Sequence, residues 1–275
     1  EKNMAENLLT ATGLEVVYGG RRGVKVLHGV DIAIRRGETV GIVGESGSGK
    51  TTLGRALLRL VDVSAGSIHF DGRDITHLAE AEMRPLRRRI QMIFQDPMAS
   101  LNPRHTIRRI LVEPLLLHGL AKNAAEAEAR VAKILERVTL PAACLDRNPH
   151  ELSGGQRQRI GIARAALLEP DFVLADEIVS GLDVSTQAQV LKLLKGLSAD
   201  LGLAMAFISH DLSVIRAVCD RVYVLRFGKV EEEGTCAAVF ANPKSDYTRI
   251  LLDAIPLPEI NPGWLDPKTG IEDAA

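Results

Sequence analysis

A glycine-rich stretch between an apolar run and a helical segment constrains this chain more than any other feature. The residues Gly44-Glu45-Ser46-Gly47-Ser48-Gly49-Lys50-Thr51 match the pattern G-x-x-x-x-G-K-[ST]. They follow the apolar run 39–43, which predicts a buried strand, and they open the segment 51–60, whose leucines recur at helical spacing. A strand, a glycine-rich loop and a helix in this order predict an α/β fold with a phosphate-binding loop.

The residue types in this loop suit the phosphates of a nucleotide. Glycines let backbone N–H groups turn towards phosphate oxygens, and the following helix adds the positive end of its dipole. Lys50 is expected to reach the β- and γ-phosphates, and the hydroxyl of Thr51 is expected to ligate Mg²⁺. Thr52 is also expected to bind the nucleotide. The alternative is a Gly/Ser turn that happens to end in lysine, which the flanking strand and helix disfavour. The loop alone does not distinguish an ATPase from a GTPase or a kinase.

Composition narrows the class of protein further. The chain has 275 residues, 46% of them hydrophobic, and a formal net charge of -1, which is typical of one large or two small globular domains. The near-neutral charge argues against a nucleic-acid partner, so the arginine-rich run 84–89 is expected to be a solvated face. The acidic run 231–233 is expected to be a solvated strand end. Three scattered cysteines provide neither a metal cage nor a disulfide framework.

Strand and helix patterns alternate along most of the chain. Apolar runs and period-two alternation predict strands at 9–17, 25–34, 39–43, 67–70, 90–94, 172–175, 204–209, 222–225 and 229–233. From 106 to about 168, helical spacing replaces the strand patterns, and further helices are predicted at 186–199 and 212–219. These patterns predict a parallel α/β sheet interrupted by a helical insert.

Two carboxylates follow the apolar run 172–175, at the kind of strand end where open α/β sheets bind their ligands. Asp176 is expected to hold Mg²⁺ through water, and Glu177 is expected to polarise an attacking water as a general base. Consecutive residues of a strand point to opposite faces, which suits two separate roles. An Asp-Glu pair after a strand is more often only solvated. The phosphate loop in the same chain favours the catalytic interpretation here.

A second glycine-rich helix start lies at Leu152-Ser153-Gly154-Gly155-Gln156, before a predicted helix over 157–168. One triphosphate does not need two such cradles. Two chains paired head to tail would use both, because each copy of this segment could cap the γ-phosphate bound by the other chain. The simpler alternative is a serine N-cap beside a Gly-Gly turn.

The order and spacing of these motifs resemble the ATP-binding subunits of ABC transporters over nearly the whole chain. In that family residues 44–51 are the Walker A motif, Asp176 and Glu177 end the Walker B motif, and 152–156 are the ABC signature. The resemblance also gives roles to four single residues. Tyr18 would stack on adenine, and Gln95 of the Q-loop would sense Mg²⁺ and the γ-phosphate. Asp183 of the D-loop would lie at a dimer interface, and His210, the switch histidine, would contact the γ-phosphate.

The resemblance implies a RecA-like P-loop NTPase core with a helical ABC subdomain and a short C-terminal appendage. The ABC ATP-binding domain is then expected at 1–250, with its core at about 1–95 and 169–235 and its helical subdomain at about 96–168. An extended tail is expected over 251–275. ATP and Mg²⁺ are the implied substrate and cofactor, with Thr51, Gln95 and Asp176 at the metal. Ile178 and Gly181 depart from the usual proline and alanine of the family.

The function implied by the resemblance is ATP hydrolysis that powers an importer. Residues 95–103 and 240–256 are similar to the dipeptide, oligopeptide and nickel group, so peptides or similar small solutes are the expected cargo. The implied partners are transmembrane permease subunits, a second ATP-binding subunit in a homo- or heterodimer and, indirectly, a substrate-binding protein. The implied location is peripheral, on the cytoplasmic face of the inner (plasma) membrane.

The sequence leaves open two alternative functions and one point about the organisation of the chain. An accessory subunit of a carbon–phosphorus lyase, an ABC ATPase that moves no solute, would carry the same motifs. DNA-repair and translation ABC proteins fit less well, because they usually have tandem cassettes, zinc modules or coiled coils. The chain starts at Glu1 rather than Met, which leaves open whether it is a free subunit or half of a tandem polypeptide.

Overall fold

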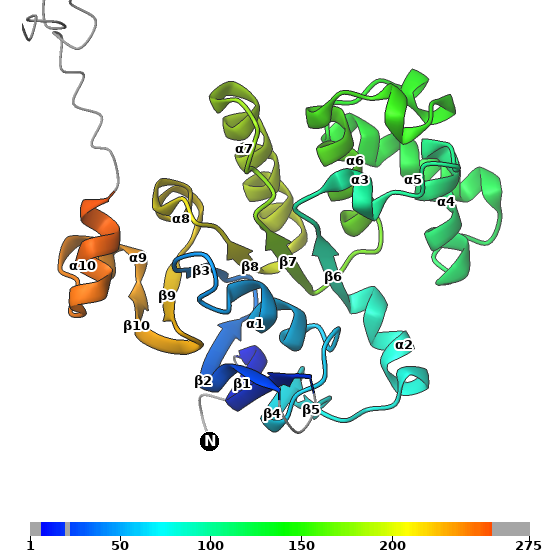
Figure 1. Cartoon of the computed structure of the whole chain (residues 1–275). Helices are drawn as coiled ribbons and strands as arrows, with labels where there is room; N and C mark the ends of the chain where they lie inside the picture. Colours follow the sequence, from blue (N-terminus) through cyan, green and yellow to red (C-terminus); the bar gives the residue numbers. More distant parts are fainter. Residues whose placement is uncertain (1–6, 20–22, 255–275) are drawn as a thin grey trace, which may run out of the picture.

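The computed structural model describes residues 7–19 and 23–254 (Figure 1). Strands and helices alternate first, a helical stretch follows, and alternation then resumes. In chain order the elements are β1 (Asn7–Tyr18), β2 (Val24–Arg35), β3 (Thr39–Val43), α1 (Lys50–Leu57), β4 (Ala65–Phe70), β5 (Arg73–Asp74), α2 (Glu80–Arg89), β6 (Ile90–Ile93), α3 (Pro97–Ser100), α4 (Ile107–Leu117), α5 (Ala124–Arg137), η2 (Ala142–Asp146), η3 (Pro149–Glu151), α6 (Gly154–Ala166), β7 (Phe172–Asp176), α7 (Val184–Leu201), β8 (Ala204–Ile208), α8 (Leu212–Val218), β9 (Arg221–Arg226), β10 (Lys229–Thr235), α9 (Cys236–Ala241) and α10 (Asp246–Asp253).

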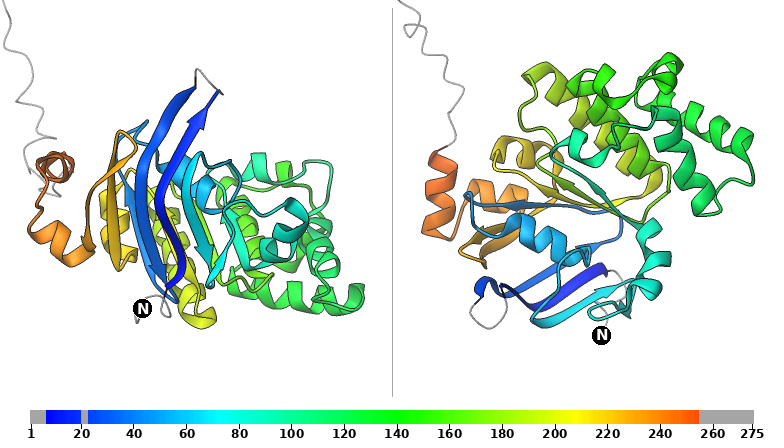
Figure 2. Two further views of the ribbon diagram at one scale, coloured as in Figure 1. Left: turned by 90° about the horizontal axis from the view of Figure 1, so that it is seen from below. Right: turned by 45° about the vertical axis from the view of Figure 1, so that its right-hand side comes forward.

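The strands form two sheets rather than the single parallel sheet that the sequence predicts (Figure 2). The larger sheet has the order β10-β9-β3-β8-β7-β6, in which every pair is parallel except the edge pair β10–β9. The smaller sheet has the order β2-β1-β4-β5 and is antiparallel. Only residues 19–23 separate β1 from β2 in sequence, and strands separated by so few residues pair as antiparallel neighbours. The N-terminal strands therefore form a layer of their own.

Period-two alternation in the parallel strands builds two hydrophobic cores. In β7, Phe172 and Leu174 face a core shared with α1 and the antiparallel sheet, whereas Val173 and Ala175 face a core shared with α6 and α7. Every residue of β7 and of β8 is buried. Strands covered on both faces have no polar side, which explains why the sequence shows them as continuous apolar runs.

Between β6 and β7 the structure has helices joined by loops and no strand, and these helices lie beside α7 (Figure 1). Thr106, Asn123 and Ser153 are the N-caps of α4, α5 and α6, and their side-chain oxygens accept backbone N–H groups of the first turn. Leu111 and Val131, which are fully buried, join these helices to the core on the α6–α7 side of the larger sheet. The helices are therefore defined by local caps and held by shared apolar packing.

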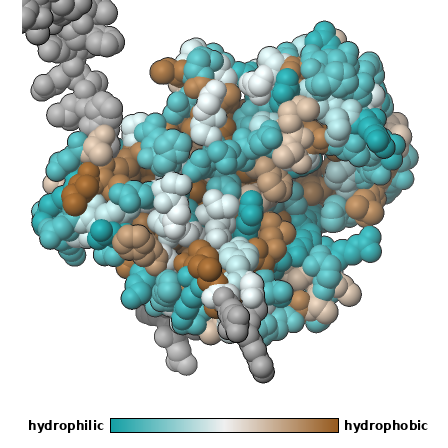
Figure 3. All heavy atoms as spheres, in the orientation of Figure 1, coloured by the Kyte–Doolittle hydropathy of each residue, from teal (hydrophilic) through white to brown (hydrophobic). Residues whose placement is uncertain are grey.

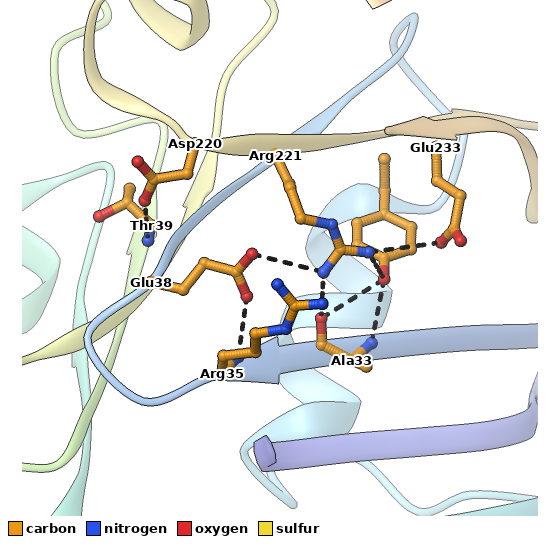
Figure 4. A network of polar contacts seen from close by, with 8 residues as sticks. Ala33, Arg35, Glu38, Thr39, Asp220, Arg221 and Glu233 are labelled. Carbon is orange, nitrogen blue, oxygen red and sulfur yellow. Dashed lines mark hydrogen bonds and ion pairs between the residues drawn. The ribbon is translucent and has the colours of Figure 1, made fainter. Parts of the chain in front are cut away.

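A polar network joins the two sheets at one end (Figure 4). The Arg221 side chain on β9 donates to the carbonyl of Ala33 on β2 at 3.2 Å, and it lies 3.4 Å from the Glu38 carboxylate. Glu38 in turn accepts the backbone N–H of Arg35 at 2.8 Å. Because both charged groups have partners from β2 and β9, the network fixes how the antiparallel layer sits on the parallel one.

The prediction of an extended tail from residue 251 is wrong for its first residues. Helix α10 continues to Asp253, and residues 255–275 lie outside the described part of the chain. Leu251 and Leu252 are half-buried and pack against the core, and the first proline of this region is Pro256. Apolar packing without an interrupting proline lets the helix run further than the sequence suggested.

The surface in the orientation of Figure 3 is mainly hydrophilic, with hydrophobic side chains in small separate groups. Single exposed apolar residues of this kind are normal on folded proteins. In residues 7–19 and 23–254, none of the helices combines the length and the apolar character that a membrane crossing requires.

Candidate active site

The strand order brings four distant segments to one edge of the larger sheet. β3, β8, β7 and β6 are consecutive neighbours, and all four are parallel. Parallel strands end at the same edge, so the residues that follow them meet there. The residues that follow β3, β8, β7 and β6 are the phosphate loop, His210, Glu177 and Gln95 respectively.

A cavity of about 350 Å³ lies at this edge. Its lining residues are Val26, Ser46, Gly47, Gly49, Lys50, Thr51, Thr52, Glu177 and His210. The predicted phosphate loop and two of the predicted catalytic residues therefore face one hollow. A larger cavity, of about 550 Å³, lies between α5, α6 and α7 and holds none of the predicted site residues. Chemistry rather than volume therefore selects the smaller cavity as the candidate site.

The glycines of the phosphate loop allow a backbone that other residues rarely adopt. Gly44 has φ 148° and Gly49, the N-cap of α1, has φ 102°. A Cβ atom at Gly44 would collide with the backbone carbonyl of Leu225 and with the hydroxyl of Ser48. The loop thus turns tightly against β9 before it enters α1.

Lys50 braces this loop from inside. Its side chain is 6% exposed, and its Nζ donates to the backbone carbonyls of Gly44 at 2.8 Å and Glu45 at 2.7 Å. Burial lowers the pKa of the Lys50 ammonium, while the nearby carboxylates of Glu177, Asp176 and Glu45 oppose that shift. The cation is therefore held where phosphate oxygens would approach the loop.

The oxygen donors at the end of β7 suit Mg²⁺. The Thr51 hydroxyl lies 3.5 Å from the carboxylate of Asp176, which is 5% exposed. Burial, with the charge of Glu177 added, raises the pKa of Asp176, so a cation beside it would relieve an unfavourable charge. The hydroxyl of Ser48 is buried without a hydrogen-bond partner, which leaves it free for a ligand. One carboxylate and one hydroxyl fit Mg²⁺, whose shell is usually completed by phosphates and water.

Two side chains converge on the Glu177 carboxylate. Its Oε2 accepts a hydrogen bond from Gln95 Nε2 at 3.1 Å and lies 3.5 Å from His210 Nδ1. The backbone of Glu177 is unusual, because its φ is 47° in a residue that is not glycine. Its N–H donates to the Ile208 carbonyl, and its own carbonyl accepts both the backbone N–H and the hydroxyl of Ser180. A strained backbone conformation that several hydrogen bonds stabilise is typical of functional sites, where the side chain must have a defined orientation.

The remaining predicted site residues do not line this cavity. Tyr18 is 43% exposed at the end of β1, beside Val24 in the antiparallel register. Ser153 begins α6, where it forms a capping box with Gln156, and Gly154 and Gly155 occupy the first turn. Asp183 is the N-cap of α7, and its carboxylate accepts the N–H of Thr186. The fold of one chain therefore brings together part of the predicted site and leaves these residues outside.

The two departures from the family pattern have local structural settings. Gly181 has φ 76°, in the left-handed region where an alanine would be strained. Ile178 is 1% exposed and packs in the core on the α6–α7 side of the larger sheet. Glycine thus suits the backbone at position 181, and isoleucine adds apolar packing at position 178.

The sequence did not point to every residue near the site. Val26, which no motif included, lines the cavity from β2. The resemblance placed Ser180 in the D-loop but did not indicate that its hydroxyl donates to the backbone carbonyl of Glu177. A valine in a strand carries no distinctive signal, because its place at the cavity depends on contacts distant in sequence.

Comparisons with known proteins agree with this geometry. The family described as ABC transporter matches residues 27–180. A Brucella ovis protein named for peptide import and ATP binding is 54% identical over 92% of this chain and 80% of its own length. The oligopeptide transport ATP-binding protein AmiF of Streptococcus pneumoniae is 49% identical over 93% of this chain and 84% of its own. A dimeric ATP-binding cassette in a post-hydrolysis state with ADP and Pi has a TM-score of 0.76 at 30% identity, covering 83% of this chain and 98% of that one.

Proposed function

The chain belongs to the ABC transporter family of ATP-binding proteins, and on this premise we propose that it powers an importer of peptides or similar small solutes. Like the ATP-binding subunits of that family, it binds and hydrolyses ATP. The observation that carries the proposal is the shared cavity, in which Lys50 of the phosphate loop and Glu177 face the same space. The peptide cargo is supported by the names of the relatives.

Glu177 is our candidate for the general base. Hydrolysis transfers the γ-phosphoryl group of ATP to water. As the water oxygen bonds to the γ-phosphorus, the bond to the leaving oxygen of ADP breaks and the Glu177 carboxylate takes the water's proton. The contacts of Gln95 and His210 with that carboxylate, at 3.1 Å and 3.5 Å, support this role because they restrict where it points.

Charge stabilisation is assigned to the phosphate loop. The Lys50 ammonium and the backbone N–H groups of residues 44–51 would bind the β- and γ-phosphates, and His210 would donate to the γ-phosphate. Thr51, Asp176 and Gln95 would hold Mg²⁺, which neutralises phosphate charge when bound. The buried Asp176 and the unpartnered Ser48 hydroxyl support this arrangement.

The residues outside the cavity are assigned to a second ATP-binding subunit. In a head-to-tail pair, residues 153–156 of one chain would cap the γ-phosphate bound at the other chain's phosphate loop, and Asp183 would lie at the interface. Tyr18 would stack on adenine. The exposure of Ser153 and Asp183 supports this proposal, as does the dimeric state of the similar cassette. Dimer closure on ATP and its release on hydrolysis would then move α3–α6 and an attached membrane partner.

The second function, as a carbon–phosphorus lyase accessory subunit, has less support. The relatives carry names for peptide import, oligopeptide transport and dipeptide transport. We therefore propose permease subunits and, through them, a substrate-binding protein as partners. The proposed location is peripheral, on the cytoplasmic face of the inner (plasma) membrane.

Affinity purification of the full-length protein from host membranes tests this function. We expect two multi-span permease chains to co-purify, and we expect ATP hydrolysis by the complex to rise when a peptide-loaded binding protein is added. Recovery of soluble lyase proteins without permeases would overturn the transport function. A complex that fails to hydrolyse ATP would overturn the assigned chemistry.

A further inference from the structure

The C-terminal helix α10 contacts the phosphate loop directly, through two residues that are 202 positions apart in sequence. The hydroxyl of Tyr247, in the first turn of α10, accepts a hydrogen bond from the backbone N–H of Glu45 at 3.1 Å. Figure 1 shows α10 beside α9, on the side of the molecule formed by β9 and β10. A residue outside the conventional nucleotide motifs is thus bonded to the backbone of one of them.

The hydrogen bond acts on one particular peptide group. The N–H of Glu45 and the carbonyl of Gly44 belong to the same planar peptide unit, so they turn together. Tyr247 holds the N–H at one end, and Lys50 Nζ holds the carbonyl oxygen at the other end, at 2.8 Å. The orientation of this peptide therefore sets an anchor point of Lys50.

The Tyr247 side chain is itself firmly placed. It is 4% exposed, and the guanidinium of Arg226 on β9 lies 4.7 Å from the centre of its ring. Burial raises the pKa of the Tyr247 phenol, which keeps the hydroxyl neutral at physiological pH. The hydroxyl is therefore a fixed acceptor for the loop.

The start of α10 is anchored by a residue that the sequence suggested to be solvated. Glu232 on β10 is 9% exposed, and its carboxylate accepts the backbone N–H groups of Lys244 at 2.9 Å and Ser245 at 3.0 Å. The expectation of a solvated acidic run is wrong at this position, because these N–H groups supply the partners that a buried carboxylate needs. The other end of α10 faces the site too, since Leu251 and Ala254 line a cavity of about 440 Å³ together with Gly44 and His210.

We infer that Tyr247 is a positioning residue for ATP binding, through which α10 holds the Gly44–Glu45 peptide, and with it Lys50, in the conformation that receives phosphate. This inference rests on the proposed role of the phosphate loop. It gives the C-terminal segment a function in the ATPase cycle of this chain. Tyr247 does not touch the reacting atoms, so its effect passes through the loop.

The test removes only the hydroxyl, with a matched control. Tyr247→Phe is compared with Tyr223→Phe, because the Tyr223 hydroxyl also accepts a backbone N–H at 3.1 Å, from Ala33, but at the far junction of the two sheets. Tyr223→Phe loses more than this one bond, because the Tyr223 hydroxyl also accepts from the Arg221 guanidinium at 2.9 Å and donates to the Ala33 carbonyl at 3.4 Å. Its melting temperature is therefore expected to fall at least as far as that of Tyr247→Phe, which makes it a stringent control for nonspecific loss of stability. Binding of MgATP to the full-length chain and steady-state hydrolysis are then measured for both.

For Tyr247→Phe we expect the Kd and KM for MgATP to rise by about 5- to 10-fold while kcat stays within about twofold, because the ground-state fit of the phosphates is lost and Glu177 is untouched. For Tyr223→Phe we expect no change in Kd. Equal Kd values for wild type and Tyr247→Phe would overturn the inference. Failure of the wild-type chain to bind MgATP would instead overturn the proposed function, so the two failures are distinguishable.

A second measurement needs no variant. Amide hydrogen exchange of Glu45 in the wild-type chain should be slow, because a buried phenol accepts that hydrogen. Exchange as fast as that of an unstructured peptide would show that the contact does not persist in solution and would overturn the inference.

Discussion

The molecule has two glycine-rich helix starts, and they differ in what completes them. In the phosphate loop, glycines adopt positive φ, and Lys50 bonds to two loop carbonyls. Residues from β2 and from the segments that follow β7 and β8 close a cavity around the helix start. At residues 152–156, no glycine has positive φ. There the N-cap Ser153 and Gln156 satisfy each other's backbone N–H groups, at 3.3 Å and 3.0 Å.

Two helix starts of similar composition therefore differ in whether one chain alone can form a ligand site around them. The phosphate loop is enclosed by its own chain, so the phosphate binding that we propose there needs only one subunit. The 153–156 helix start is capped by its own side chains and lines none of the cavities described above, so it offers its remaining N–H groups outward. A ligand for it must come from another molecule, as the proposed head-to-tail pairing requires.

The largest expected effect comes from a variant that separates binding from turnover. Glu177→Gln should lower kcat by about 10²- to 10⁴-fold, because a general base is lost, and should leave the Kd for MgATP nearly unchanged. If the 153–156 segment needs a bound γ-phosphate from a second chain, this variant should also accumulate as a dimer on addition of MgATP. Single-turnover hydrolysis and light scattering measure both effects, with Glu136→Gln on the exposed side of α5 as control. Wild-type turnover in Glu177→Gln would refute the assignment of the base.

The second-largest effect tests the phosphate loop, the helix start that its own chain encloses. Lys50→Ala removes the buried cation that faces the phosphates, so the Kd for MgATP should rise by about 100-fold. Lys192→Ala, on the exposed face of α7, makes the same change without a phosphate nearby and should not alter binding. The Kd is measured by titration with a fluorescent ATP analogue. Unchanged affinity in Lys50→Ala would remove the basis of the phosphate-loop assignment.

A matched pair of glycine variants compares the two helix starts directly. Gly44→Ala should lower the free energy of unfolding by about 2–4 kcal/mol, because its Cβ would collide with the Leu225 carbonyl at a strained φ. Gly154→Ala should be neutral or stabilising by up to about 1 kcal/mol, because no atom lies within 4 Å of its Cβ and alanine favours a helix. Urea denaturation measures both. Equal losses would contradict the contrast between an enclosed and an open helix start.

The smallest effect concerns the open helix start alone. Ser153→Ala removes the cap of α6 and should lower the free energy of unfolding by about 1 kcal/mol. The Kd for MgATP measured on the monomer should not change, whereas hydrolysis should fall under conditions in which two chains pair. Measuring hydrolysis against protein concentration separates these cases. A changed monomer Kd would mean that Ser153 acts within one chain.

Local chemistry made much of the site predictable. The phosphate loop, the Asp176–Glu177 pair and the helix start at Ser153 are each encoded in a few consecutive residues, since turns, caps and strand ends depend on neighbours in sequence. The antiparallel sheet was harder to predict, because its register joins β1 to β2 and to β4 through pairs whose partners lie outside any local pattern. Glu232 shows the same limit: an acidic run looks solvated until the start of α10 is placed above it.

What the sequence determined by itself is therefore the local character of each segment: a glycine-rich loop that ends in lysine, a strand that ends in carboxylates, and a self-capped helix start. Only the tertiary structure decided which segments meet. The order β3-β8-β7-β6 brings Lys50, His210, Glu177 and Gln95 to one edge, and the docking of α10 brings Tyr247 to the loop. The physical reason is that strand order and helix docking depend on the burial of apolar faces across the whole chain, which no short pattern records.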